Sequence, residues 1–223
     1  MAIIATQFSS RSIIDDYSHT ESGPDLLQAA QARSKERLLA FLAVMPKELD
    51  RQDDEIAASL IRENSSGKVK LGKIYSLLSA IGQAVAPHVA CSKGCSDCCK
   101  MNVSISIIEA ERLSFISGRN LAAVSRPVRH RSDEFSGIPC PFLKDNACTV
   151  YEHRPFACRA HYSFDDTAYW CHPDRSNAAE FSLLESGGAK QAYQEIVLKS
   201  RLGGFADIRD FFPTNNAGSQ LEG

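Results

Sequence analysis

The sequence lacks a large excess of either charge. Lysine and arginine together number 25 and aspartate and glutamate together number 27, which gives a formal net charge of −2. A protein that binds nucleic acid through its phosphates needs a clear excess of basic residues, so the composition argues against a nucleic-acid partner. A local basic run between residues 119 and 131 leaves a protein partner open. A solvated loop is the simpler interpretation of that run.

Long apolar runs are also missing. No stretch approaches the roughly 18 to 20 uninterrupted apolar residues of a membrane span, so we expect no membrane association. The first residues, "MAIIATQFSSRSIIDDYSH", lack a basic start followed by an apolar core of roughly 7 to 15 residues, and therefore do not form a secretory signal. These absences favour the cytoplasm. Thiols stay reduced there, and closely spaced cysteines bind metal more often than they form disulfides.

The common catalytic signatures are absent as well. The chain contains no Gly-x-Ser-x-Gly motif, no phosphate-binding loop and no dinucleotide-binding glycine pattern. The adjacent carboxylates Asp165 and Asp166 are interpreted as solvated loop residues. Residues 1–90 and 172–223 contain no cysteine, although the whole chain has 8. The chemistry is therefore expected in one central segment.

Apolar residues spaced three and four apart predict helices on both sides of that segment. The expected helices cover residues 24–45, a stretch through 56–61, residues 69–86 and residues 189–202. Proline at positions 46 and 87 ends two of them. Residues 103–107 alternate like a short strand, and the pair Ser106 and Glu109 forms a capping-box pattern that starts another helix, closed by Gly118.

The predicted fold class is therefore mainly α. A helical layer packs around a loop-rich, metal-nucleated cysteine-cluster domain with at most a short strand or hairpin. We expect an amino-terminal helical extension at 1–87, a cysteine-cluster metal-binding domain at 88–175, and a carboxy-terminal helix and tail at 176–223. Because residues 88–175 show little regular structure, we expect them to depend on metal for their loop conformation.

Four cysteines crowd into the stretch "CSKGCSDCCK" at residues 91–100. Thiolates are soft, strong ligands for zinc and iron, and the spacing of Cys91, Cys95 and Cys98 lets one loop wrap a single centre. Cys98 and Cys99 are adjacent, and an extended backbone sends successive side chains to opposite faces. Either these two thiols serve different centres, or one of them is not a ligand. We expect the first.

A second group of cysteines completes the set, at Cys140, Cys148, Cys158 and Cys171. Eight thiolates suffice for two four-thiolate centres, and the favoured arrangement is interleaved, with each centre drawing on both groups. Two divalent centres would leave a net charge of about −4, which is costly to bury without cations. Arg154 and Arg159 are the expected cofactor-binding cations near the sulfurs, whereas Lys93, Lys100 and Lys144 are assigned to surface solubility.

The cysteine run, followed by "CPFL" at 140–143 and "CTVYEHRPFACR" at 148–159, resembles the CxxCxxCC cysteine-cluster family. This is the family of zinc- or iron-chelating domain proteins that are also called YkgJ-like. All eight family cysteines match, over roughly residues 88 to 175. The resemblance implies metal or iron–sulfur binding, and it extends to flagellin lysine N-methylases, which use S-adenosylmethionine.

Three functions remain open from the sequence. The first is a metal-binding protein that holds an iron–sulfur cluster (4Fe–4S) or Zn²⁺ in a structural or electron-carrying role. The second is an S-adenosylmethionine-dependent protein-lysine methyltransferase-like enzyme, and the third is a zinc- or iron-handling protein. Both metals accept four thiolates, but the three-residue spacing differs from zinc-ribbon knuckles and favours iron–sulfur. With eight thiolates present, His153, His161 and His172 are not needed as ligands.

The spacing of Cys91, Cys95 and Cys98 also matches the radical S-adenosylmethionine signature. That signature opens a large α/β barrel, and only 125 residues follow Cys98. The remaining chain lacks the alternation of strands and helices that such a barrel needs. We therefore do not favour this interpretation.

Overall fold

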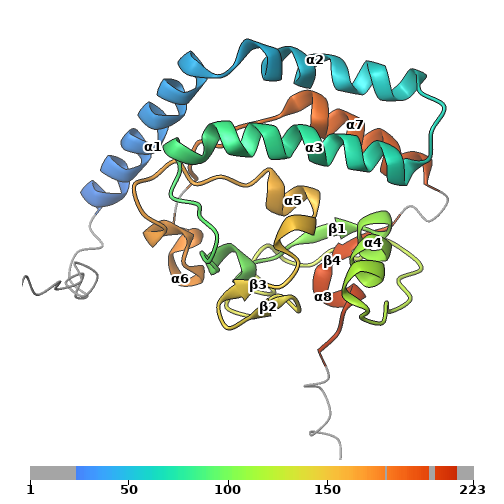
Figure 1. Cartoon of the computed structure of the whole chain (residues 1–223). Coiled ribbons are helices and arrows are strands. Elements are labelled where there is room, and N and C mark those ends of the chain that lie inside the picture. The colour runs from blue at the N-terminus through green and yellow to red at the C-terminus, as the bar shows by residue number, and fades with distance from the viewer. Residues whose placement is uncertain (1–23, 179, 201–203, 215–223) are drawn as a thin grey trace, which may run out of the picture.

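A helical layer forms the upper part of the computed structural model, which describes residues 24–178, 180–200 and 204–214 (Figure 1). Its helices are α1 (Pro24–Val44), α2 (Lys47–Arg62), α3 (Gly67–Val85) and α7 (Gly187–Lys199). They confirm the expected helices at 24–45 and 69–86 to within a few residues. The expected stretch through 56–61 lies in α2, which begins well before it, at Lys47. The predicted end of the last helix, at 202, lies outside the described residues.

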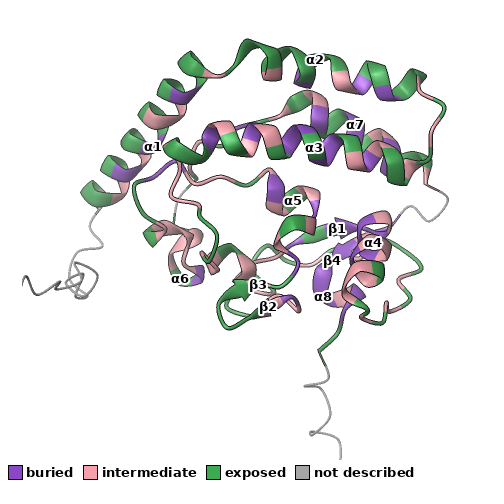
Figure 2. Ribbon diagram, viewed as in Figure 1, coloured by how far each residue is buried: buried purple, intermediate pink, exposed green. Residues whose placement is uncertain are grey.

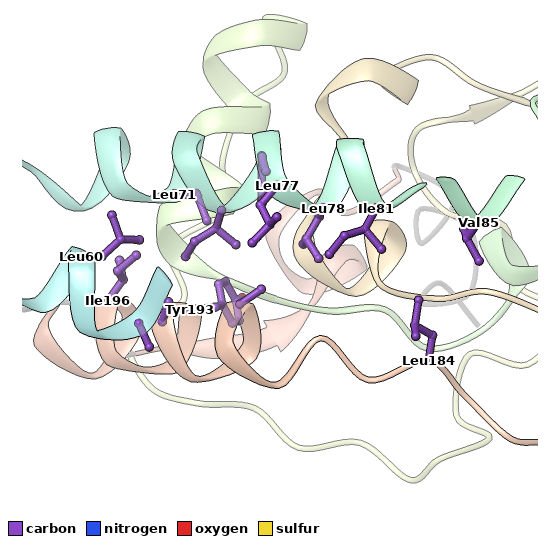
Figure 3. Close-up of a cluster of buried hydrophobic side chains, with 14 of the residues drawn as sticks. Leu60, Leu71, Leu77, Leu78, Ile81, Val85, Leu184, Tyr193 and Ile196 are labelled. Atoms are coloured by element: carbon purple, nitrogen blue, oxygen red, sulfur yellow. The ribbon is translucent and has the colours of Figure 1, made fainter. Parts of the chain in front are cut away.

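One face of α3 supplies the main apolar core. Leu71, Ile74, Leu78 and Ile81 are at most 1% exposed, and they recur at the helical spacing seen in the sequence. They face residues of α2 and α7 in the core between the three helices (Figure 3). Burial of each such side chain contributes roughly 1.5 to 3 kcal/mol. This core fixes the layer on which the cysteine segment rests.

The layer is also tied together by a buried carboxylate. Asp53 of α2 accepts hydrogen bonds from the backbone N–H groups of Gly188 at 3.1 Å and Ala189 at 2.9 Å. The carboxylate thus satisfies two free N–H groups at the start of α7 and lies at the positive end of its dipole. The approach is so close that a Cβ at Gly188 would lie 1.6 Å from the backbone oxygen of Asp53.

A second core lies beneath this layer, around α4 (Ile107–Ser117). The predicted capping box of Ser106 and Glu109 is present, and α4 ends at Gly118, whose φ is 69°. Strand β1 (Ser104–Ser106) confirms the expected strand and pairs antiparallel with β4 (Phe205–Asp207). The pairing partner β4 and the following α8 (Ile208–Phe211) were not predicted.

Both β1 and α8 are largely buried (Figure 2). Residues from within the cysteine segment and from after it therefore share one core. That core includes Ile105, Leu113, Phe142 and Phe211.

The remaining chain is rich in loops, as expected. Its short elements are η1 (Ala86–His88), η2 (Asp97–Lys100), β2 (Leu143–Lys144), β3 (Ala147–Cys148), η3 (Tyr151–His153), α5 (Phe156–Arg159), η4 (Tyr169–Cys171) and α6 (Pro173–Ser176). Strands β2 and β3 form a hairpin whose turn places Asp145 and Asn146 at positive φ. The described part of the chain is mainly α, with two small antiparallel sheets of two strands each. None of the described helices is long and apolar enough to cross a membrane.

Candidate metal centre

All eight cysteines carry free thiols. Cys91 and Cys95 lie in a loop, and Cys98 and Cys99 lie in η2. The second group is spread over separate short elements: Cys140 precedes β2, and β3, α5 and η4 carry Cys148, Cys158 and Cys171. Cys98 is exposed, whereas the other seven are partly buried.

The backbone around Cys98 and Cys99 is helical rather than extended. Both residues belong to the 3₁₀ helix η2, in which successive side chains are about 120° apart. The expectation that an extended backbone sends the two thiols to opposite faces is therefore wrong. The two thiols interact: a side-chain hydrogen bond with Cys99 is the main cause that raises the pKa of Cys98, and loss of solvation adds to it.

The two groups of cysteines lie against each other. The backbone N–H of Cys140 donates to the carbonyl of Cys99 at 2.7 Å. The N–H of Ser163 donates to the sulfur of Cys91 at 3.2 Å, and the side chain of Ser163 lies beside Cys171. Segments that are far apart in the sequence are thus joined directly at the thiols.

The mutual influence of the thiols divides them into two subsets. Burial raises the pKa of Cys171 to about 11, with further contributions from the charges of Cys91, Cys95 and Cys98. In the other subset, burial raises the pKa of Cys140 to about 11, and the charge of Cys148 adds to the effect.

Burial also raises the pKa of Cys158 well above its ordinary value, with contributions from Cys98, Cys140 and Cys148. Cys98 therefore interacts with members of both subsets. One subset consists of Cys91, Cys95 and Cys171, and the other of Cys140, Cys148 and Cys158.

Arg154 is the cation whose charge influences the pKa of the most thiols among the described residues. Its guanidinium lies over the Tyr151 ring at 3.8 Å, and its Nε donates to the carbonyl of Tyr151 at 3.0 Å. The pKa values of four thiols are raised, by burial or, for Cys98, mainly by its hydrogen bond with Cys99, and the positive charge of Arg154 partly offsets this rise. These thiols are Cys91, Cys98, Cys148 and Cys158.

Arg159 acts on the backbone instead. It is 8% exposed, and its guanidinium donates to the carbonyl of Arg154 at 2.7 Å, to Ser79 Oγ at 2.8 Å and to the carbonyl of Glu152. It also lies 4.6 Å from the centre of the Tyr75 ring. Arg159 thus fixes the segment that carries Cys158 against α3.

A third arginine, Arg209 of α8, was missed by the sequence reasoning. It forms a buried ion pair with Asp207 at 2.9 Å and donates to the backbone carbonyls of Cys99 at 3.4 Å and Met101 at 3.2 Å. Its charge partly offsets the rise that burial causes in the pKa of Cys140. The only local signal is the capping box that begins with Asp207, and nothing in it indicates a cysteine site.

The remaining candidates take structural roles. His172 accepts a hydrogen bond from the N–H of Asp174 at 3.3 Å and caps α6. Burial lowers the pKa of His161. The interpretation of Asp165 and Asp166 as solvated loop residues is wrong for Asp165, whose side chain is 3% exposed and pairs with Arg33 at 3.2 Å.

The lysines near the cysteines lie at or near the surface. Lys93 approaches Glu152 at 4.0 Å, and Lys100 approaches Asp97 at 3.8 Å. Both distances lie at the outer limit of an ion pair. Lys144 is exposed.

The donor set is chemically suited to a thiophilic metal, because two segments supply eight free thiols and the guanidinium of Arg154 acts on four of them. The coordination geometry itself is not formed: among the described residues, no three side chains of His, Cys, Asp or Glu are gathered closely enough to hold a metal ion. Binding therefore requires thiols to move together and to lose their protons.

Comparison with known families agrees with this donor set. Residues 90–176 match the family model CxxCxxCC, described as "Putative zinc- or iron-chelating domain". No curated protein and no solved structure matches the chain. The matched range contains all eight cysteines, Arg154 and Arg159.

Proposed function

Because residues 90–176 form a CxxCxxCC domain, we propose that this protein holds iron–sulfur clusters or zinc through its eight cysteines. The centre would serve a structural or electron-carrying role. The observation that carries the proposal is that hydrogen bonds link the two distant cysteine groups. The N–H of Cys140 donates to the carbonyl of Cys99, and the N–H of Ser163 donates to the sulfur of Cys91. Separate structural cysteines would have no reason to converge in this way.

Two interleaved centres are the arrangement that the thiol interactions favour. Cys171 from the second group interacts with Cys91 and Cys95 from the first, while Cys140, Cys148 and Cys158 interact among themselves. Cys98 and Cys99 lie between these subsets and would complete them. The roles of Arg154 and Arg159 follow: the first would offset thiolate charge, and the second would hold the backbone of Cys158.

Iron–sulfur is the favoured content, as two 4Fe–4S clusters, because the spacing of Cys91 and Cys95 departs from the paired knuckles of zinc ribbons. One observation favours the alternative of a zinc- or iron-handling protein. Cys98 is an exposed residue, so part of the cysteine cluster lies at the surface of the protein. Exchange of a metal between proteins needs thiols at the surface.

The test is purification under anaerobic conditions, followed by an absorption spectrum and assays of iron, zinc and acid-labile sulfide. Two 4Fe–4S clusters would give a brown protein with about eight iron and about eight sulfide per chain. Two zinc centres would give a colourless protein with about two zinc per chain. A folded protein that binds neither metal under reducing conditions would overturn the proposal.

A further inference from the structure

Helix α1 lies along one edge of the molecule and is attached to it by few buried side chains (Figures 1 and 2). Between Asp25 and Val44, only Ala30, Ser34 and Phe41 are buried. Ser34 has no hydrogen-bond partner for its buried hydroxyl among the described residues, which costs free energy rather than stabilising the contact. By comparison, α3 buries seven side chains. The docking of α1 therefore depends on a small number of specific contacts.

Those contacts go to the two segments that carry cysteines. Arg37 donates to the carbonyl of His88 at 3.1 Å and pairs with Asp166 at 2.8 Å. Arg33 pairs with Asp165 and Asp166, both at 3.2 Å. His88 lies three residues before Cys91, and the two aspartates lie between Cys158 and Cys171. Helix α1 thus contacts residues that lie beside cysteines of both groups in the sequence.

The apolar anchor of α1 follows the same pattern. The ring of Phe41 lies 6.1 Å from that of Phe164 and 5.4 Å from that of His88. Phe164 is 1% exposed and directly precedes Asp165. The seat of α1, by which we mean the surface of His88 and Phe164 on which Phe41 packs, therefore forms only when the segments around residues 88 and 164 lie side by side.

Hydrogen bonds at the thiols hold those segments together. The N–H of Ala90 donates to the carbonyl of Ser163 at 2.8 Å, and the N–H of Ser163 donates to the sulfur of Cys91 at 3.2 Å. The side chain of Ser163 also lies beside Cys171. Contacts thus run from Cys91, through Ser163 with Cys171 beside it, to the residues beneath α1.

We infer that α1 is a latch. It docks when metal is bound, and it slows release of the metal from the part of the centre that contains Cys91 and Cys171. The inference rests on the proposed function. A metal that joins the two thiols fixes the residues that form the seat of α1, and it therefore favours docking. Because coupling between two sites is reciprocal, docking of α1 favours retention of the metal by the same factor.

The test compares two charge-matched variants of the full chain. Arg33→Gln/Arg37→Gln removes the latch contacts without touching a thiol. Lys35→Gln/Lys47→Gln also removes two positive charges, from exposed positions on α1 and α2. Each protein is loaded with the metal that anaerobic purification yields, and its release to an excess of a colorimetric chelator is timed. We expect release about tenfold faster from the arginine variant and unchanged from the lysine variant.

Hydrogen exchange of the wild-type protein supplies the second readout. Removing the metal is expected to accelerate exchange in residues 26–41 at least tenfold, while α2, α3 and α7 keep their protection. The same protection of α2, α3 and α7, measured in the arginine variant, shows that this variant is folded. Equal release rates for the two variants, or equal protection of α1 with and without metal, would overturn the latch alone. A wild-type protein that takes up neither zinc nor iron would overturn the proposed function and the latch together.

Discussion

The backbone N–H of Phe156 donates a 2.7 Å hydrogen bond to the buried carboxylate of Glu109. The same carboxylate accepts from the hydroxyl of Tyr75 at 2.7 Å, from the hydroxyl of Tyr193, and from both the N–H and the hydroxyl of Ser106. Burial and the Glu109 charge raise the pKa of Tyr75 and of Tyr193, so both remain donors. Glu109 thereby joins the helical layer to α5, which carries Cys158.

Replacing Glu109 with glutamine should destabilise the protein strongly. An amide offers one acceptor oxygen and places its NH₂ group against donors that previously met a carboxylate oxygen. Hydrogen bonds to a charged group contribute roughly 1.5 to 3 kcal/mol each, so we expect the free energy of unfolding to fall by about 3 kcal/mol. Chemical denaturation of the metal-free protein measures it.

The control for this substitution is Glu111→Gln on the same helix. Glu111 pairs with Lys68 at 3.0 Å at the surface, where such pairs contribute at most about 1 kcal/mol. We therefore expect little change. Equal effects at positions 109 and 111 would contradict a structural role for the buried carboxylate.

The close approach of α2 and α7 predicts a sharp difference between two neighbouring glycines. A Cβ at Gly188 would lie 1.6 Å from the backbone oxygen of Asp53, whereas a Cβ at Gly187 has no atom within 4 Å. Gly188→Ala must push the helices apart and should lower the free energy of unfolding by about 2 kcal/mol or more. Gly187→Ala should be neutral or slightly stabilising. Similar melting temperatures for the two variants would contradict the packing described for α7.

The interleaved arrangement predicts the metal content of cysteine variants. Cys171→Ser should empty the centre shared with Cys91 and Cys95, and Cys158→Ser should empty the other. Each variant should keep about half of the bound metal, and the double variant almost none. Elemental analysis of the purified proteins measures the content. Loss of all metal from either single variant would indicate one coupled cluster instead of two centres.

The raised thiol pKa values predict how the metal-free protein responds to alkali. Burial moves the pKa of Cys140 and of Cys171 from 9.0 to about 11. The folded state therefore holds these protons more tightly than the unfolded state. This contribution to stability is fully present below pH 9 and is lost as the pH rises towards 11. We expect a loss of roughly 1 to 2 kcal/mol per thiol.

Thermal unfolding of the reduced, metal-free protein between pH 8 and pH 11 measures this loss. The variant Cys140→Ser/Cys171→Ser is the control, because lysines and tyrosines also titrate in this range. It should show a smaller loss than the wild type. In the metal-loaded protein the ligand thiols are already deprotonated, so the difference between the two proteins should disappear. An equal loss of thermal stability between pH 8 and pH 11 in the wild type and the variant would contradict the raised pKa values of Cys140 and Cys171.

The long helices were predictable because their information is local. Apolar residues three and four apart mark α1, α2 and α3, and Pro46 and Pro87 lie just after the ends of α1 and α3. The four-residue helices α5 and α6 carry no such periodicity, since each is barely longer than one turn. They form because flanking contacts hold them, such as Glu109 at the start of α5.

The cysteine ligand candidates were visible from residue type and spacing alone, but their surroundings were not. Arg209 reaches the carbonyl of Cys99 from 110 residues away, and Asp165 is buried by Arg33, which is 132 residues away. Such pairs leave no periodic mark in a single sequence. The conformation of Cys98 and Cys99 was missed for a related reason, because four residues of 3₁₀ helix look like any other loop.

The strand pair β1 and β4 has a consequence for the order in which the chain is made. Val103 is held by the carboxylate of Asp207, 104 residues later, and the N–H of Ile208 reaches back to the carbonyl of Val103. A ribosome therefore releases every cysteine before it releases the strand that closes the core beside them. During that interval the thiols are reactive and unsupported. We therefore expect a reducing environment, or early metal capture, to favour correct folding of the nascent chain.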